Sequence, residues 1–96
     1  MLIEFIEPAS IELDDALHYY ELQLKGLGSK FLNEVIETID LIRQFPQSWT
    51  KNSEHTRKAV LRKFPYNLIY SILNNKIYII AVAHQNRTPE YWIERL

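Results

Sequence analysis

The spacing of the apolar residues changes once along the chain, and this change constrains the fold more than any other feature. Up to about residue 46 apolar residues recur mainly at helical spacing, whereas after residue 56 they form runs rich in Ile, Val, Leu and Tyr that are typical of strands. Two helices followed by a sheet predict the α+β class. The chain has 96 residues, which suffices for one hydrophobic core, so we expect a single domain over residues 1–96.

The first half predicts a short strand and an antiparallel helical hairpin. Residues 2–6 alternate apolar and acidic positions, and Pro8 follows, at a place suited to the first turn of a helix. Apolar spacing predicts an amphipathic helix over 11–24 and a second helix over 31–42, which ends at Phe45-Pro46. The only two glycines, Gly26 and Gly28, lie between them, and Ser29 is the predicted cap of the second helix.

The second half predicts three consecutive antiparallel strands, over 57–61, 66–73 and 76–84, after a loop over 47–56. Asn74-Asn75 suits a two-residue hairpin turn, because Asn tolerates positive φ. The resulting register places one wholly apolar face toward the helices, with the pairs Ile72–Ile77, Tyr70–Ile79 and Leu68–Ala81. The opposite face then carries the pairs Ser71–Tyr78, Ile69–Ile80 and Asn67–Val82, followed by His84.

This opposite face is half apolar, which is unusual for a sheet face in contact with water. Two interpretations are open: the face is a surface for a partner, or the tail of the chain, with Tyr91 and Trp92, folds over it.

The charge is distributed unevenly along the chain. Residues 1–50 carry nine acids and three bases, a net charge of −6, whereas residues 51–96 carry eight bases and three acids, a net charge of +5. This split indicates either an acidic or anionic partner or mutual attraction between the halves. Lys58 and Arg62, four residues apart and close to Arg57 and Lys63, form a basic strip that suits nucleic acid or, as we favour, an acidic protein.

The chain lacks the residues that several kinds of chemistry require. The chain has no cysteine and only three scattered histidines, so we expect no metal site and no cofactor. Glycine-rich phosphate loops and the turn of serine hydrolases are absent. No apolar run reaches the ~20 residues of a membrane span, and the start does not resemble a signal peptide, so we expect a cytoplasmic protein without a membrane partner.

One cluster of polar residues follows the last predicted strand. His84 and the adjacent Gln85-Asn86-Arg87 bring an imidazole, an amide and a guanidinium together at one edge of the sheet. These groups suit phosphate binding or acid–base chemistry, and they equally suit a turn fixed by hydrogen bonds.

Three segments resemble the RelE/ParE superfamily of toxins from type II toxin-antitoxin modules. They are Gly26-Leu27-Gly28-Ser29-Lys30-Phe31-Leu32, Leu61-Arg62-Lys63-Phe64-Pro65-Tyr66-Asn67-Leu68-Ile69-Tyr70 and Ala81-Val82-Ala83-His84-Gln85-Asn86-Arg87-Thr88-Pro89-Glu90-Tyr91-Trp92. The resemblance covers nearly the whole chain and agrees with the predicted order of strand, two helices and three strands. It implies a growth-inhibiting toxin of the kind linked to plasmid stabilization, held inactive by a cognate antitoxin encoded beside it.

The resemblance favours the ParE branch over the ribosome-dependent ribonucleases. Lys58 and Tyr91 match the ribonuclease pattern, but Val60, Asn67 and Gln85 occupy the other three positions. Those positions otherwise supply cations for RNA cleavage, and a net charge of −1 is unfavourable for docking on ribosomal RNA. The resemblance to the ParE branch then implies a toxin that inhibits DNA gyrase by binding, without catalysis of its own.

Two alternatives stay open. One is a RelE-like endoribonuclease that acts on mRNA in the ribosome, with Lys58, His84, Arg87 and Tyr91 as its candidate catalytic residues. The other is a decayed toxin that only binds its antitoxin. For the antitoxin we expect an acidic amphipathic segment on the second sheet face. The residues predicted to bind it are Lys58, Arg62, Ile69, Tyr78, Ile80, Val82 and Arg87.

Overall fold

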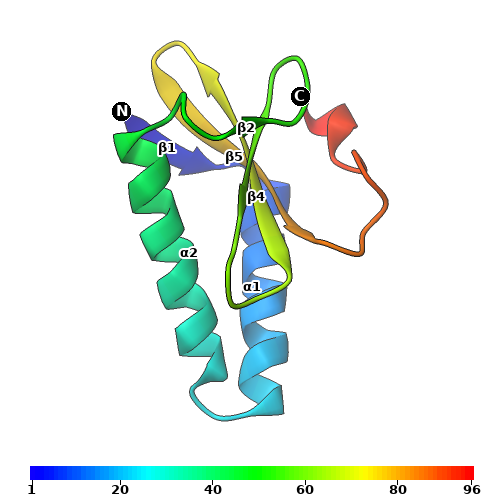
Figure 1. Cartoon of the computed structure of the whole chain (residues 1–96). Helices are drawn as coiled ribbons and strands as arrows, with labels where there is room; N and C mark the ends of the chain where they lie inside the picture. Colours follow the sequence, from blue (N-terminus) through cyan, green and yellow to red (C-terminus); the bar gives the residue numbers. More distant parts are fainter.

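The computed structural model describes residues 1–96 and confirms the α+β class, with two helices packed on one face of a sheet. Figure 1 shows the helices side by side, joined by a short loop at one end, with the sheet across their other end. The elements are β1 (Leu2–Phe5), α1 (Glu7–Gln23), α2 (Leu27–Gln44), β2 (Thr50–Lys51), β3 (Arg57–Val60), β4 (Tyr66–Leu73), β5 (Lys76–His84) and a C-terminal 3₁₀ turn, η1 (Ile93–Arg95).

The sheet has five strands in the order β1-β5-β4-β3-β2, two more than the predicted antiparallel sheet of three. The N-terminal strand joins it in parallel beside β5, with Leu2 opposite Lys76 and Phe5 opposite Ile79. β2 is an edge strand of two residues within the segment predicted as a loop. Such a short polar strand has no period that a sequence pattern can detect.

The helical hairpin is confirmed, but both helices are longer than predicted. α1 begins four residues before Ile11, with Pro8 in its first turn, and α2 begins at Leu27 after Gly26, which has a φ of 89°. Ser29 does not cap α2, because it lies inside the helix and makes no capping hydrogen bond.

The interhelical loop is instead held by the Glu21 carboxylate, which accepts hydrogen bonds from the Gly26 and Gly28 N–H groups at 3.0–3.1 Å. Gly28 is buried where the helices approach closely. A Cβ atom at this position would lie 2.8 Å from the Leu17 carbonyl oxygen.

The predicted β4–β5 register is correct only next to the turn. Asn74 and Asn75 have φ values of 51° and 61°, and the pairs Ile72–Ile77 and Tyr70–Ile79 form as expected. A bulge then adds Ile80 to β5, and this extra residue shifts all later pairs by one. The observed pairs are Ile69–Ala81, Leu68–Val82, Asn67–Ala83 and Tyr66–His84.

The bulge changes which face several side chains occupy. Val82 packs with Leu68 in the core beneath the helices, so its predicted place on the opposite face was wrong. His84, paired with Tyr66, also lies on the helical side. Ala81 and Ala83 take the places on the opposite face.

The opposite face, here called the outward face, is partly covered. Trp92 from the C-terminal segment packs with Ile69 and Ile80 in a second cluster and is only 3% exposed. Of the two interpretations left open by the sequence, the tail folded over this face is the one that the structure shows at Trp92.

Candidate functional site: the C-terminal segment and the outward sheet face

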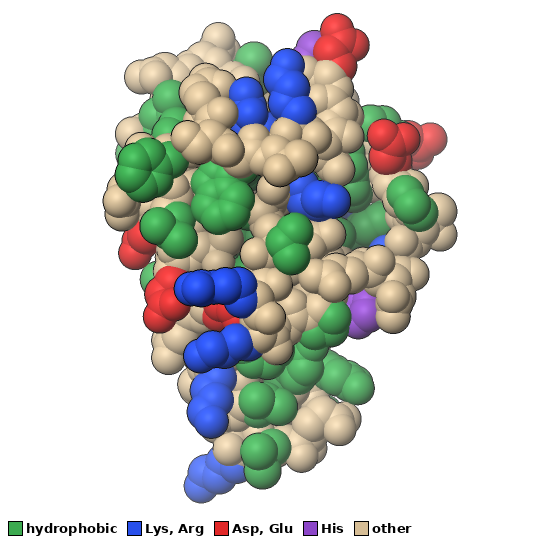
Figure 2. Space-filling view, viewed as in Figure 1, with side chains coloured by type: hydrophobic (Ala, Val, Ile, Leu, Met, Phe, Trp, Pro, Cys, Tyr) green, Lys and Arg blue, Asp and Glu red, His purple; other side chains and the backbone are tan.

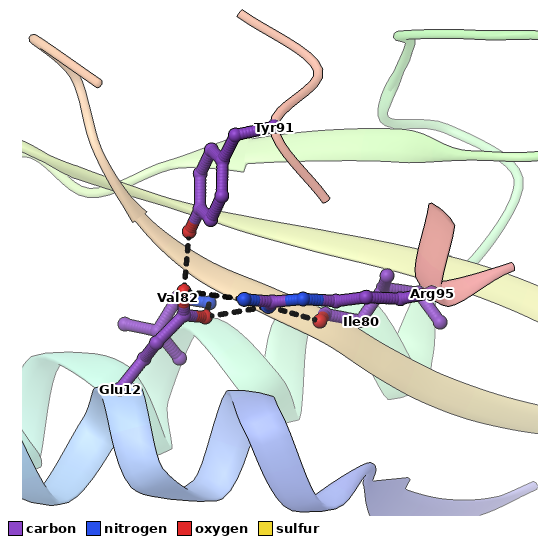
Figure 3. A network of polar contacts seen from close by, with 5 residues as sticks. All are labelled: Glu12, Ile80, Val82, Tyr91 and Arg95. Carbon is purple, nitrogen blue, oxygen red and sulfur yellow. Dashed lines mark hydrogen bonds and ion pairs between the residues drawn. The ribbon is translucent and has the colours of Figure 1, made fainter. Parts of the chain in front are cut away.

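A network centred on Glu12 holds the C-terminal segment against β5 (Figure 3). Arg95 donates to both oxygens of the Glu12 carboxylate, each at 2.9 Å, and Tyr91 donates its hydroxyl proton to the same carboxylate at 2.6 Å. Both partners of the ion pair are mostly buried, with side-chain exposures of 16% for Glu12 and 20% for Arg95. Bidentate contacts of this kind fix orientation as well as adding energy.

The same pair completes the hydrogen bonding of β5 where β1 has ended. The last main-chain bond beside β1 runs from the Ile6 N–H to the Ile79 carbonyl. Beyond it, Glu12 accepts from the Val82 N–H at 3.0 Å, and Arg95 donates to the Ile80 carbonyl at 3.0 Å. The pair therefore takes the place of a neighbouring strand and protects an otherwise open edge.

The network shifts the pKa values of its members. Burial alone would raise the pKa of Glu12, but the hydrogen bonds from Arg95, Tyr91 and the Val82 N–H outweigh it and hold the pKa below its ordinary value. Burial and the bond to Glu12 raise the pKa of Tyr91. Tyr91 is thus a neutral donor whose proton is committed to Glu12.

Among the four candidate catalytic residues, the structure separates Lys58 from His84 by the sheet. Lys58 alternates with the core residue Ala59 and pairs with Ile69, which places it on the outward face. His84 lies on the helical side of the sheet. Its Nδ1 accepts the Asn86 N–H at 3.0 Å, so the proton of the neutral ring is on Nε2.

The other two candidates stack on each other. The Arg87 guanidinium lies 3.9 Å from the centre of the Tyr91 ring, while the Arg95 guanidinium lies 5.1 Å from it. Arg87 and His84 share the lining of a cavity of about 260 Å³ between α1 and the end of β5, together with Asp15 and Tyr19. This cavity does not include Lys58 or Tyr91.

The seven predicted partner-binding residues do not form one surface. Lys58 and Tyr78 lie half-buried on the outward face, Ile69 and Ile80 lie in the cluster beneath Trp92, and Val82 is in the core. Arg62 lies in the turn after β3, where its backbone N–H and that of Lys63 donate to the Glu34 carboxylate of α2. Arg87 is in the C-terminal segment on Tyr91.

The open part of the outward face forms a groove of about 640 Å³ toward the β4–β5 turn. Tyr78, Ser71 and Ile80 line it from β4 and β5, Lys51 and His55 line it from β2 and the loop after it, and Arg57 lines it from the start of β3. The Ser71 hydroxyl donates to the His55 carbonyl at 2.8 Å and so ties this segment to β4.

No group of three or more His, Asp or Glu side chains in the chain is arranged to hold a metal ion. Neither helix is long and apolar enough to cross a bilayer.

Comparison with known proteins identifies the family. The model of the ParE toxin of the type II toxin-antitoxin system parDE matches residues 3–89, which is most of the chain. The chain belongs to the ParE toxin family. A solved chain of the chromosomal ParDE toxin-antitoxin system from P. aeruginosa has the same fold, with a TM-score of 0.77 and 18% sequence identity over 88% of this chain and 95% of that chain. The search of the curated proteins returned no match.

The predicted ParE branch of the superfamily is thus confirmed, and with it a toxin-antitoxin role at the level of the family. Within this ParE domain, sequence reasoning missed Glu12 and Arg95. A signal for Glu12 existed, because it falls with Ala9, Leu13 and Ala16 on the stripe of α1 that packs toward the sheet. No sequence signal pointed to Arg95, since its partner Glu12 is 83 residues away in the chain.

Proposed function

We propose that this ParE-family protein is the toxin of a type II module, is neutralised by a cognate antitoxin, and stops growth by binding DNA gyrase without cutting RNA. The observation that supports the absence of RNA cleavage is the separation of the candidate catalytic groups. Lys58 is on the outward face, His84 is on the helical side, and the proton of Tyr91 is held by Glu12.

Cleavage of RNA through its own 2′-hydroxyl needs a proton acceptor, a proton donor and positive charge around one phosphate. A phosphate on the outward face would meet Lys58, and it would be separated from His84 by the sheet. Tyr91 also has a raised pKa and an intramolecular acceptor, so it is a poor acid for a leaving oxygen at neutral pH.

The outward face also lacks further positively charged side chains at the positions that the ribonuclease pattern requires beside Lys58. Val60 pairs with Asn67 across β3 and β4, and the Gln85 side chain donates to the Asn67 side chain at 3.4 Å. These three neutral residues stand where the resemblance to the ribonuclease branch calls for cations. Lys58 would therefore be the one cation of this set available to stabilise the charge of a phosphate on the outward face.

The second candidate function is the ribosome-dependent endoribonuclease, and one observation favours it. His84 and Arg87 line the same cavity, so an imidazole and a guanidinium are available to one bound group. If this cavity were a catalytic centre, replacing either residue would abolish toxicity.

The test is induced expression in a bacterial host without the antitoxin, with separate readouts of DNA damage and of translation. We expect growth arrest with a DNA-damage response, equally from the parent and from His84→Ala and Tyr91→Phe. Arrest with cleaved mRNA, lost in His84→Ala, would establish the ribonuclease instead. Unimpaired growth with the parent protein would leave only the decayed toxin.

A further inference from the structure

The side of α1 that faces away from the core carries a second row of residues at helical spacing. The inner side packs on the core through positions four and three apart, at Ala9, Leu13, Ala16 and Tyr20. Positions two residues further along have the same spacing and lie on the opposite side of the helix. They are Ile11, Asp15, His18 and Leu22, here called the outer strip, and all four are exposed.

The outer strip is apolar at both ends and polar in the middle. Ile11 is 52% exposed and Leu22 is 79% exposed, although the outer side of a helix in a globular protein normally carries polar residues. Asp15 and His18 lie between them, and neither forms an ion pair within the chain. A partner that fits this strip must therefore offer apolar side chains at its two ends and polar groups that complement Asp15 and His18 at its centre.

A second copy of α1 meets these requirements when the two helices are antiparallel. A two-fold axis between positions 16 and 17 places Ile11 opposite the partner's Leu22 and Asp15 opposite the partner's His18. An imidazole can donate a hydrogen bond to a carboxylate in either of its protonation states. A parallel pair would instead bring the two Asp15 carboxylates together. The alternating spacing of four and three is also the spacing at which two helices pack along a common seam.

The charges at the ends of α1 favour the same orientation. Glu7 is exposed in the first turn and Lys25 is exposed just after the last turn, and neither has an ion-pair partner in the chain. Figure 2 shows Lys and Arg side chains at the end of the molecule with the interhelical loop. Antiparallel pairing brings Glu7 of one copy near the partner's Lys25. Two further acids of α1, Glu12 and Glu21, are already bound within the chain, which leaves Asp14 as the unpaired acid beside the strip.

We propose that this chain forms a homodimer through the outer strip, with the two α1 helices antiparallel. The inference does not depend on the proposed action on gyrase. α1 has 17 residues and is about 25 Å long, so we expect the helix pair to bury less than the ~1,200 Å² at which stable interfaces begin. The dimer is therefore reversible and depends on protein concentration.

Sedimentation equilibrium of the full chain, from micromolar to about millimolar concentration, tests the proposal. We expect the parent to dimerise and Leu22→Asp to weaken dimerisation at least about tenfold, because it places a charge in an apolar contact. Leu73→Asp is the matched control, since Leu73 is 58% exposed and lies outside the strip, and it should dimerise like the parent. Circular dichroism checks that each variant is folded.

A charge reversal tests the centre of the strip. His18→Asp faces the partner's Asp15 with a like charge and should weaken dimerisation at least about tenfold. The double variant Asp15→Lys/His18→Asp restores opposite charges across the interface and should recover the dimer. A double variant that dimerises no better than His18→Asp would contradict the pairing.

Cross-linking tests the orientation, because the chain has no cysteine of its own. Ile11→Cys mixed with Leu22→Cys should form a disulfide between the two variants. Neither variant should cross-link to itself, since equal positions of an antiparallel pair lie about 16 Å apart along the helix axis.

Four results would overturn the proposal. They are a parent that stays monomeric up to about 1 mM, a folded Leu22→Asp that dimerises like the parent, cysteine variants that cross-link mainly to themselves, and a monomeric parent whose Leu22→Asp variant loses gyrase inhibition. The last result would assign the outer strip to the target instead of a second copy.

Discussion

Glu12 places a carboxylate on the apolar stripe of α1, where it meets three hydrogen-bond donors from the C-terminal segment and from β5. The Arg95 guanidinium, the Tyr91 hydroxyl and the Val82 N–H all bond to it. Burying a charge is costly unless it is paired and hydrogen-bonded, and here both conditions hold. The C-terminal segment, with Trp92 on the outward face, therefore depends on one residue of α1.

Replacing Glu12 by Gln keeps the shape and removes the charge. We expect the free energy of unfolding to fall by about 2 kcal/mol, because Arg95 is left partly buried without its counter-ion. Urea denaturation followed by tryptophan fluorescence measures the change. Asp14→Asn, on the exposed side of the same helix, is the control and should stay within about 0.5 kcal/mol of the parent. Equal stability of the two variants would show that the network contributes nothing.

The Glu12 network also predicts an acid dependence. The pKa of Glu12 is lower in the folded protein than in the unfolded chain, so its stabilisation is fully present above the ordinary carboxylate value of about 4.3 and is lost as the pH falls through the lower folded value. Unfolding free energies of the parent and Glu12→Gln, measured from pH 7 downward, should converge below about pH 4. Curves that stay parallel over this range would contradict the assigned pKa direction.

Among the elements, the helical hairpin depends on close contact between α1 and α2 near the loop that joins them. Gly28 is needed because the Leu17 carbonyl leaves no room for a Cβ atom. Gly28→Ala should therefore lower stability by about 2 kcal/mol, although alanine favours helices over glycine by about 1 kcal/mol elsewhere. Ser29→Ala, next in sequence, caps nothing and should change stability by less than about 0.5 kcal/mol. Thermal and urea unfolding of both variants provide the measurement, and a stabilised Gly28→Ala would refute the contact.

The helices and the strands β3, β4 and β5 could be predicted because each has a period or a run of apolar residues. The register near Asn74-Asn75 could be predicted as well, since the turn fixes it. The bulge at Ile80 could not, because one extra residue in an apolar strand leaves no trace in the pattern, and it moved Val82 and His84 to the helical side. β1 was expected as a strand, but its parallel partner is set by tertiary packing that local spacing does not encode.

The C-terminal segment is the element whose role the sequence left open. Its covering of the outward face can be tested by Trp92→Ala, which removes a side chain that is 3% exposed. We expect a loss of about 3 kcal/mol in unfolding free energy, the usual cost of a large truncation in a core. The matched truncation Ile93→Ala, at a residue 43% exposed in the same segment, should cost much less. Similar losses in the two variants would mean that Trp92 does not anchor the segment.

At the scale of the whole molecule, the acidic first half and the basic second half of the chain exchange only two ion pairs, Glu4–Lys76 and Glu12–Arg95, and the other six bases of the second half have no acidic partner. The sequence predicted this asymmetry and the residue types at the site. It could not predict the groove, because Lys51 and His55 reach it only through the position of β2 and the loop that follows. The candidate catalytic residues were close in sequence or in predicted strands, and the sheet separates Lys58 from His84.

The central claim, that this ParE toxin acts on gyrase by binding alone, is tested most directly by adding purified toxin to DNA gyrase and, separately, to a translation extract. At micromolar toxin we expect supercoiling to stop or cleaved DNA to be trapped on gyrase, and the adjacent reading frame's product to reverse the effect, while mRNA in the extract stays intact. Unimpaired gyrase together with mRNA cut in the ribosomal A site would contradict the claim.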